Sequence, residues 1–169
     1  MNARELNEKE LSPYLEKLLD QIGLELLERE VHIGKFKLDA VAIDRKSRCI
    51  VVVELKVVCT KDALGQLLLY PRAVRQKLKD SSKTVRSLLI TTHLDQGVVE
   101  IVEELQPTHN IQLWVCASGE GQDLRLVKPD HLDVKNKQVW DQSQLGQSPT
   151  PSWKRVAEKL AKLDQGAAS

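Results

Sequence analysis

The segment GKFKLDAVAID, residues 34–44, is followed after a short polar stretch by the segment IVVVELK, residues 50–56. The first segment mixes apolar and polar residues, and the second contains a β-branched run. Both patterns are typical of β-strands. Residues 45–48 between them favour a loop. The sequence therefore predicts a β-hairpin whose strands occupy residues 35–44 and 48–58.

The register of this hairpin determines which side chains face each other. A loop at residues 45–48 pairs Asp44 with Cys49, and counting back along both strands places Asp39 opposite Glu54. Residues opposed in this way have Cβ atoms about 5 Å apart. Lys56 lies two residues beyond Glu54 and points to the same face of the sheet. Two carboxylates and an amine are therefore expected to converge.

Opposed carboxylates on a sheet are destabilising unless something compensates their charge. Mg²⁺ does so, because it takes oxygen ligands and commonly uses one or two carboxylates together with waters and a substrate phosphate. We expect Asp39, Glu54 and the main-chain carbonyl of Leu55 to be its ligands. Lys56 would orient the attacking water or neutralise charge that develops on a phosphate, which predicts phosphodiester hydrolysis. The alternative is that Lys56 only neutralises the two acids in a partly buried ion pair.

The rest of the chain predicts a sheet covered by helices on both faces. Apolar periodicity indicates helices at 4–22, 96–105 and from Thr60 or Asp62 to about Leu78, the last interrupted by Pro71. It also indicates strands at 24–32, 85–92, 111–117 and 124–128. The fold class is α/β with a mixed central sheet flanked by helices. Residues 1–130 are expected to form this domain, with a polar linker at 131–152 and an amphipathic helix and tail at 153–169.

The sequence resembles the PD-(D/E)XK nuclease superfamily, which has a restriction-endonuclease-like fold. Asp39 is followed after fourteen residues by Glu54-Leu55-Lys56, although Leu38 replaces the proline that names the motif. The segment ALGQLLLY, residues 63–70, is similar to a helix of RecB-type and archaeal mismatch-type repair nucleases. In that helix a glutamine and a tyrosine border the active site, and Gln66 and Tyr70 match them here.

The resemblance implies a deoxyribonuclease that uses Mg²⁺ or Mn²⁺, with Asp39, Glu54, Lys56, Gln66 and Tyr70 as its catalytic residues. Gln66 and Tyr70 could instead only satisfy hydrogen bonds at the edge of the core.

Members of this family often carry a further acid on the first helix. Glu16 is the candidate for this additional metal ligand, with Asp20 and Glu8 on a similar face, and Glu28 and Glu30 on the first strand compete for the role. Ordinary surface charge of a helix also explains Glu16.

Composition excludes several other classes of protein. The 169 residues are 41% hydrophobic and 29% charged with a net charge of +1, which is typical of a globular protein and leaves any phosphate-binding surface local. We expect a cytoplasmic protein without membrane association, because no membrane-spanning stretch or secretory signal is evident. Three cysteines without a C-x-x-C pair indicate buried thiols. No phosphate-binding glycine loop, dinucleotide fingerprint or zinc-ligand spacing is present.

The predicted function is therefore a metal-dependent DNA endonuclease in DNA repair, recombination or defence. A homodimer is a candidate assembly, because paired cuts on both strands generally need two active sites. The alternative function is a non-cleaving nucleic-acid-binding or assembly module that retains the nuclease fold. A subunit that needs a partner, bound through the helix at 152–164, is a third possibility.

Overall fold

The computed structural model of the protein describes residues 7–78, 82–93, 96–118 and 123–131. Their strands form one six-stranded sheet in the order β1-β2-β3-β4-β5-β6. The pairs β3–β4 and β4–β5 are parallel and the other three pairs are antiparallel, so the sheet is mixed. The strands are β1 (Leu24–Ile33), β2 (Phe36–Asp44), β3 (Ile50–Val58), β4 (Val85–His93), β5 (Ile111–Ser118) and β6 (Leu124–Val127).

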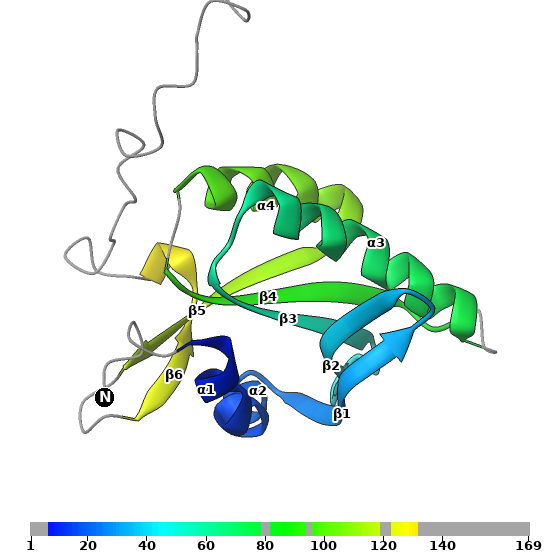
Figure 1. The fold of residues 1–169 in the computed structure, drawn as a ribbon, viewed down its shortest axis with the longest axis horizontal. Coiled ribbons are helices and arrows are strands. Elements are labelled where there is room, and N and C mark those ends of the chain that lie inside the picture. The colour runs from blue at the N-terminus through cyan, green and yellow to red at the C-terminus, as the bar shows by residue number, and fades with distance from the viewer. Residues whose placement is uncertain (1–6, 79–81, 94–95, 119–122, 132–169) are drawn as a thin grey trace, which may run out of the picture. The chain divides into compact units, whose positions relative to one another are not determined.

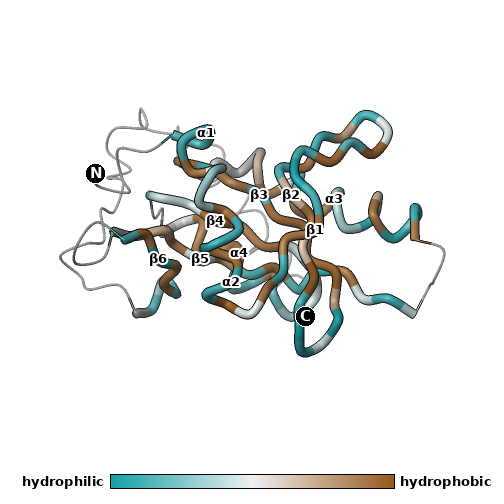
Figure 2. The backbone as a smooth tube through the Cα atoms, turned by 90° about the horizontal axis from the view of Figure 1, so that it is seen from below, coloured by the Kyte–Doolittle hydropathy of each residue, from teal (hydrophilic) through white to brown (hydrophobic). Residues whose placement is uncertain are grey.

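Helices lie on both faces of this sheet, as predicted. Figure 1 shows α3 (Lys61–Lys77) and α4 (Gln96–His109) above the sheet, and α1 (Glu8–Leu11) and α2 (Leu15–Gln21) below it. Each face buries its own apolar cluster, and the brown stretches through the middle of the tube in Figure 2 mark the apolar central strands. Among the described helices, none is long and apolar enough to cross a membrane.

The chain divides into two compact units, Met1–Val139 and Trp140–Ser169. The fold described here belongs to the first unit, and a 3₁₀ turn at Pro129–His131 ends its described part. The predicted linker after His131 and the predicted C-terminal helix at 153–169 lie outside the described residues.

The first predicted helix is not one continuous helix. A 3₁₀ turn at Ser12–Tyr14 separates α1 from α2, and Pro13 stands inside that turn. Proline has no N–H to donate and restricts the backbone around it, so the α-helical hydrogen-bond ladder cannot run through this point unchanged. The prediction of a single helix across residues 4–22 was wrong for this reason, and residues 4–6 lie outside the described part.

The hairpin of β2 and β3 has the predicted register. Ile43 pairs with Ile50 and Ala40 with Val53, and the Asp44 N–H donates to the Cys49 carbonyl at 2.9 Å. The Asp44 carboxylate also accepts from the backbone N–H groups of residues 46 and 47, which stabilises the turn. The regular pairing of β2 with β3 stops at Ala40.

Beyond Ala40 the hairpin of β1 and β2 packs against α3. Phe36 and Val31 lie against a cluster that contains Tyr70 and Val74 of α3. A β-bulge between Leu26 and Glu28 lies in β1, and bulges bend strands and increase their twist. The outer half of this hairpin is therefore held by the helix.

The remaining predicted elements are confirmed with small changes at their ends. The Thr60 side chain caps α3 by accepting from the Ala63 N–H, and the helix continues through Pro71 to Lys77. The helix α4 ends at His109, beyond the predicted residue 105. The three cysteines are buried thiols, as predicted.

Candidate active site

The site lies where β2 separates from β3. The Asp39 carboxylate accepts a hydrogen bond from the Leu55 N–H at 2.7 Å. The Asp39 side chain thus accepts the hydrogen bond that a main-chain carbonyl of β2 would have accepted if the β2–β3 ladder had continued. In an extended strand the N–H and C=O of one residue point to the same side. The Leu55 carbonyl therefore points toward the β2 side of the strand, where Asp39 lies.

Lys56 joins two acids from different elements. Its Nζ atom lies 3.0 Å from Oε1 of Glu54 and 3.6 Å from Oε1 of Glu8 on α1. The Glu54 side chain is only 4% exposed, whereas the Lys56 side chain is 23% exposed and the Glu8 side chain 47%. The cluster therefore opens to solvent on the side of Lys56 and Glu8.

The Glu54 carboxylate has only one of its two oxygens in contact with a partner among the described residues. Its Oε2 atom is buried and has no hydrogen-bond partner among the residues that the structure describes. Burial, together with the nearby charge of Asp39, raises the pKa of Glu54 to about 7, and the contact with Lys56 only partly opposes this. A buried polar atom without a partner is costly, and in native structures it often marks a site completed by a ligand, ion or water.

The two neighbours of Glu54 are shifted as well. Burial raises the pKa of Asp39, although the Leu55 hydrogen bond and the charge of Lys56 oppose the change. Burial disfavours the charged form of Lys56, but the hydrogen bond and charge of Glu54 outweigh it, so the pKa of Lys56 is raised. One ammonium thus faces two carboxylates whose ionisation the fold disfavours.

This arrangement fits a divalent cation. The carboxylates of Asp39 and Glu54 and the carbonyl of Leu55 are oxygen donors of the kind that Mg²⁺ and Mn²⁺ prefer. Within the described part of the chain, no three histidine, cysteine or acidic side chains form a complete metal-ligand set. Water and a phosphate oxygen would supply the remaining ligands, as is usual for Mg²⁺ at phosphate-binding sites.

The two predicted site residues of α3, Gln66 and Tyr70, differ in burial. Tyr70 is 5% exposed, and its ring meets that of Phe36 edge-on with centroids 5.5 Å apart. Burial raises the pKa of Tyr70, and the charge of Glu54 raises it further, which places the hydroxyl within the field of the acidic cluster. Gln66 is exposed on α3. Among the described residues, neither Tyr70 nor Gln66 has a hydrogen bond with Asp39, Glu54 or Lys56, and Tyr70 is instead held by its contact with Phe36.

The acid that the first helices bring to this site is Glu8. Glu16 instead lines a surface hollow of about 390 Å³ together with Asp20 and Arg45. The 3₁₀ turn at Ser12–Tyr14 separates the segment that carries Glu8 from the segment that carries Glu16. The sequence predicts Glu8 only as an alternative to Glu16, and its ion pair with Lys56 is what brings it to the site.

Two threonines at the end of β4 were not predicted as part of this region. Thr91 pairs with Lys56 in the parallel register of β3 and β4. The Thr92 hydroxyl donates to the carbonyl of Val57 at 3.2 Å, and the Thr91 hydroxyl lies 3.1 Å from the same carbonyl and 2.8 Å from the carbonyl of His93. They fix the backbone directly after Lys56. The signal in the sequence is the change from apolar to polar residues within SLLITTH, residues 87–93.

Comparison with known proteins supports the assignment of the fold. No protein-family model matches the sequence, and no curated protein matches it. A solved structure of a repair endonuclease from Pyrococcus abyssi is similar with a TM-score of 0.50 and 21% identity, over 64% of this chain and 46% of that one. The structure of an EndoMS-dsDNA2 complex is similar with a TM-score of 0.53 and 23% identity, over 68% of this chain and 46% of that one.

The chain thus spans less than half the length of either endonuclease. These similarities confirm the predicted α/β fold, a mixed central sheet flanked by helices that is shared with nucleases.

Proposed function

We propose that the protein is a DNA endonuclease that depends on Mg²⁺ or Mn²⁺ and belongs to the PD-(D/E)XK superfamily. The observation that carries the proposal is the buried, unpartnered Oε2 of Glu54 beside Asp39 and Lys56. A structural ion pair alone would leave that oxygen without a partner, whereas a cation would satisfy it. The similar fold of two endonucleases supports the same conclusion.

Each residue of the cluster has a distinct role in this proposal. Asp39, Glu54 and the Leu55 carbonyl hold the cation, which when bound polarises a phosphoryl oxygen and makes hydroxide available near neutral pH. The Leu55 N–H keeps the Asp39 carboxylate in position through its hydrogen bond.

The raised pKa of Lys56 keeps its side chain protonated at neutral pH. Lys56 acts in this proposal as a positive charge that stabilises the phosphate as negative charge develops. Tyr70 supports the cluster from α3. Gln66 is exposed on α3, and we assign it a contact with the substrate.

Double-stranded DNA is the substrate that we propose first. One of the two similar structures is a complex of EndoMS with dsDNA. The other is a repair endonuclease. Repair, recombination and defence all remain compatible with such an activity. A homodimer would supply the second active site that paired cuts require.

The test is cleavage of labelled linear, single-stranded, mismatched and branched DNA with Mg²⁺, Mn²⁺ or chelator. The wild-type protein is compared with the Asp39→Asn and Lys56→Met variants. Asp39→Asn removes the charge but retains an oxygen that can accept from the Leu55 N–H. Lys56→Met retains an apolar stem of similar length.

Metal-dependent cutting that both substitutions abolish, in variants with unchanged circular dichroism, would support the proposal. If the wild type binds one of these DNA forms but cuts none with any metal, a non-cleaving binding module takes its place.

A further inference from the structure

The tip of the β1–β2 hairpin carries an exposed lysine that is linked to the active site through two aromatic rings. The Lys35 Nζ atom lies 5.5 Å from the centroid of the Phe36 ring, a distance at which the cation is attracted to the ring. Phe36 in turn contacts Tyr70 edge-on at 5.5 Å. Phe36 lies three residues before Asp39 on β2. The packing of Phe36 on Tyr70 therefore holds the tip against α3 on the strand that carries Asp39.

The charges around the tip favour an anionic partner. Lys37 forms an ion pair with Glu30 at 2.7 Å, which neutralises both side chains. Across the described residues, no ion pair involves Lys35, so its charge is available. The part of α3 that contacts the tip, around Tyr70 and Val74, is followed by basic residues. The helix carries one acid, Asp62 in its first turn, and the basic residues Arg72, Arg75 and Lys77 nearer its end.

The spacing along β2 relates the tip to the scissile phosphate. Lys35 precedes Asp39 by four residues, which is about 13 Å along an extended strand. Neighbouring phosphates of one DNA strand are separated by about 3.4 Å along the helix axis. A DNA strand that follows β2 from Asp39 would therefore meet Lys35 within about four nucleotides.

We infer that the tip of the β1–β2 hairpin is a DNA-backbone contact. Lys35 binds a phosphate a few nucleotides from the one that would be cleaved beside Asp39 and Glu54, and the packing of Phe36 on Tyr70 holds the tip in place. Phosphate contacts position a duplex and carry no sequence information, so this contact sets the register of cutting and not its sequence preference. The inference rests on the proposed function, because it assumes that DNA occupies the acidic cluster.

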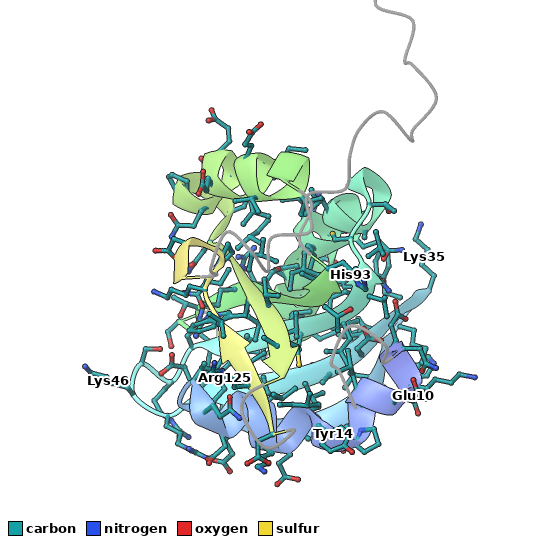
Figure 3. The ribbon with its side chains drawn as sticks, turned by 90° about the vertical axis from the view of Figure 1, so that its left-hand side faces the viewer. Glu10, Tyr14, Lys35, Lys46, His93 and Arg125 are labelled. Atoms are coloured by element: carbon teal, nitrogen blue, oxygen red, sulfur yellow. The ribbon has the colours of Figure 1, made fainter. Side chains whose placement is uncertain are left out.

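The test compares Lys35→Gln with Lys46→Gln, two substitutions that remove the same charge from an exposed lysine. Figure 3 shows that Lys35 and Lys46 project on opposite sides of the molecule, which makes Lys46→Gln a matched control. Binding of labelled duplex DNA to the full chain is measured by fluorescence anisotropy in chelator, between about 50 and 200 mM salt. Thermal melting shows whether each variant is folded.

The logarithm of the association constant falls linearly with the logarithm of the salt concentration, and one lost phosphate contact makes this slope shallower by about 0.9. At about 0.1 M salt this corresponds to an affinity about eightfold lower. We expect this change for Lys35→Gln and none for Lys46→Gln. Phe36→Leu should weaken binding in the same direction while Lys35 is still present, because the ring that positions the lysine is gone.

Equal affinities and salt slopes for Lys35→Gln and Lys46→Gln would overturn the inference, and wild-type cleavage in the presence of metal would show that the proposed function still stands. A wild-type protein that neither binds nor cuts DNA would overturn both.

Discussion

Raising the pH should destabilise the protein in the absence of metal, because Glu54 must ionise inside the fold. Its pKa is raised from an ordinary value of 4.5 to about 7 by burial and by the charge of Asp39. Between these two values the folded protein keeps a proton that the unfolded chain has released. Stability therefore falls as pH rises through this window and levels off above about pH 7.

The size of the effect follows from the same values. Each pKa unit corresponds to about 1.4 kcal/mol, so the difference between 4.5 and about 7 gives about 3 kcal/mol in the free energy of unfolding. This is a large share of the stability of a typical domain. The Glu54→Gln variant has no proton to lose at this position, and its stability should not show this decrease.

The assay is urea unfolding followed by circular dichroism at a series of pH values from about 4 to about 8, with chelator present. Because other groups titrate in both proteins, the quantity of interest is the difference in free energy of unfolding between the wild type and Glu54→Gln. We expect that difference to change by about 3 kcal/mol in favour of the variant across the series. A difference that is independent of pH would refute the reasoning.

Three further perturbations have defined outcomes. Lys56→Met leaves the facing carboxylates without their ammonium. We expect the free energy of unfolding, measured with urea, to fall by about 2 kcal/mol at pH about 8 and by less at pH about 5. Equal losses at the two pH values would contradict this. Glu8→Gln should slow single-turnover DNA cleavage at least about tenfold, whereas the control Glu16→Gln should leave the rate unchanged; equal rates would exclude Glu8 from the site. Arg86→Met should lower the free energy of unfolding by about 2 kcal/mol, because it breaks the 3.0 Å ion pair with Asp44. DNA cleavage at low temperature should persist. Lost cleavage in a folded variant would contradict a purely structural role.

The core of the candidate site could be predicted because hairpin geometry is a short-range property. The loop at residues 45–48 fixes the pairing of β2 with β3 as far as Ala40 and Val53, and the predicted pair of Asp39 with Glu54 lies just beyond that ladder. The Asp39 carboxylate instead accepts from the Leu55 N–H, and Lys56 contacts Glu54 as the two-residue side-chain period predicts. No long-range information is needed for this step.

Other parts of the site depend on tertiary packing that the sequence pattern does not determine. The contact of Glu8 with Lys56 depends on how α1 packs beside β3, and the apolar periodicity of the first helices does not determine that packing. The contact of Phe36 with Tyr70 arises because the outer hairpin leaves the β2–β3 ladder and packs on α3. Helical spacing alone cannot show how far each residue of α3 is buried.

Binding of Mn²⁺, followed by electron paramagnetic resonance of the free ion, tests most directly whether the facing acids form a metal site. The titration is made on the wild type and on Asp39→Asn at about pH 8, where Glu54 is ionised. We predict saturable binding by the wild type and at least about tenfold weaker binding by the folded variant. Equal binding by the two proteins, or no binding by a wild type that cleaves DNA, would contradict the assignment of Asp39 and Glu54 as metal ligands.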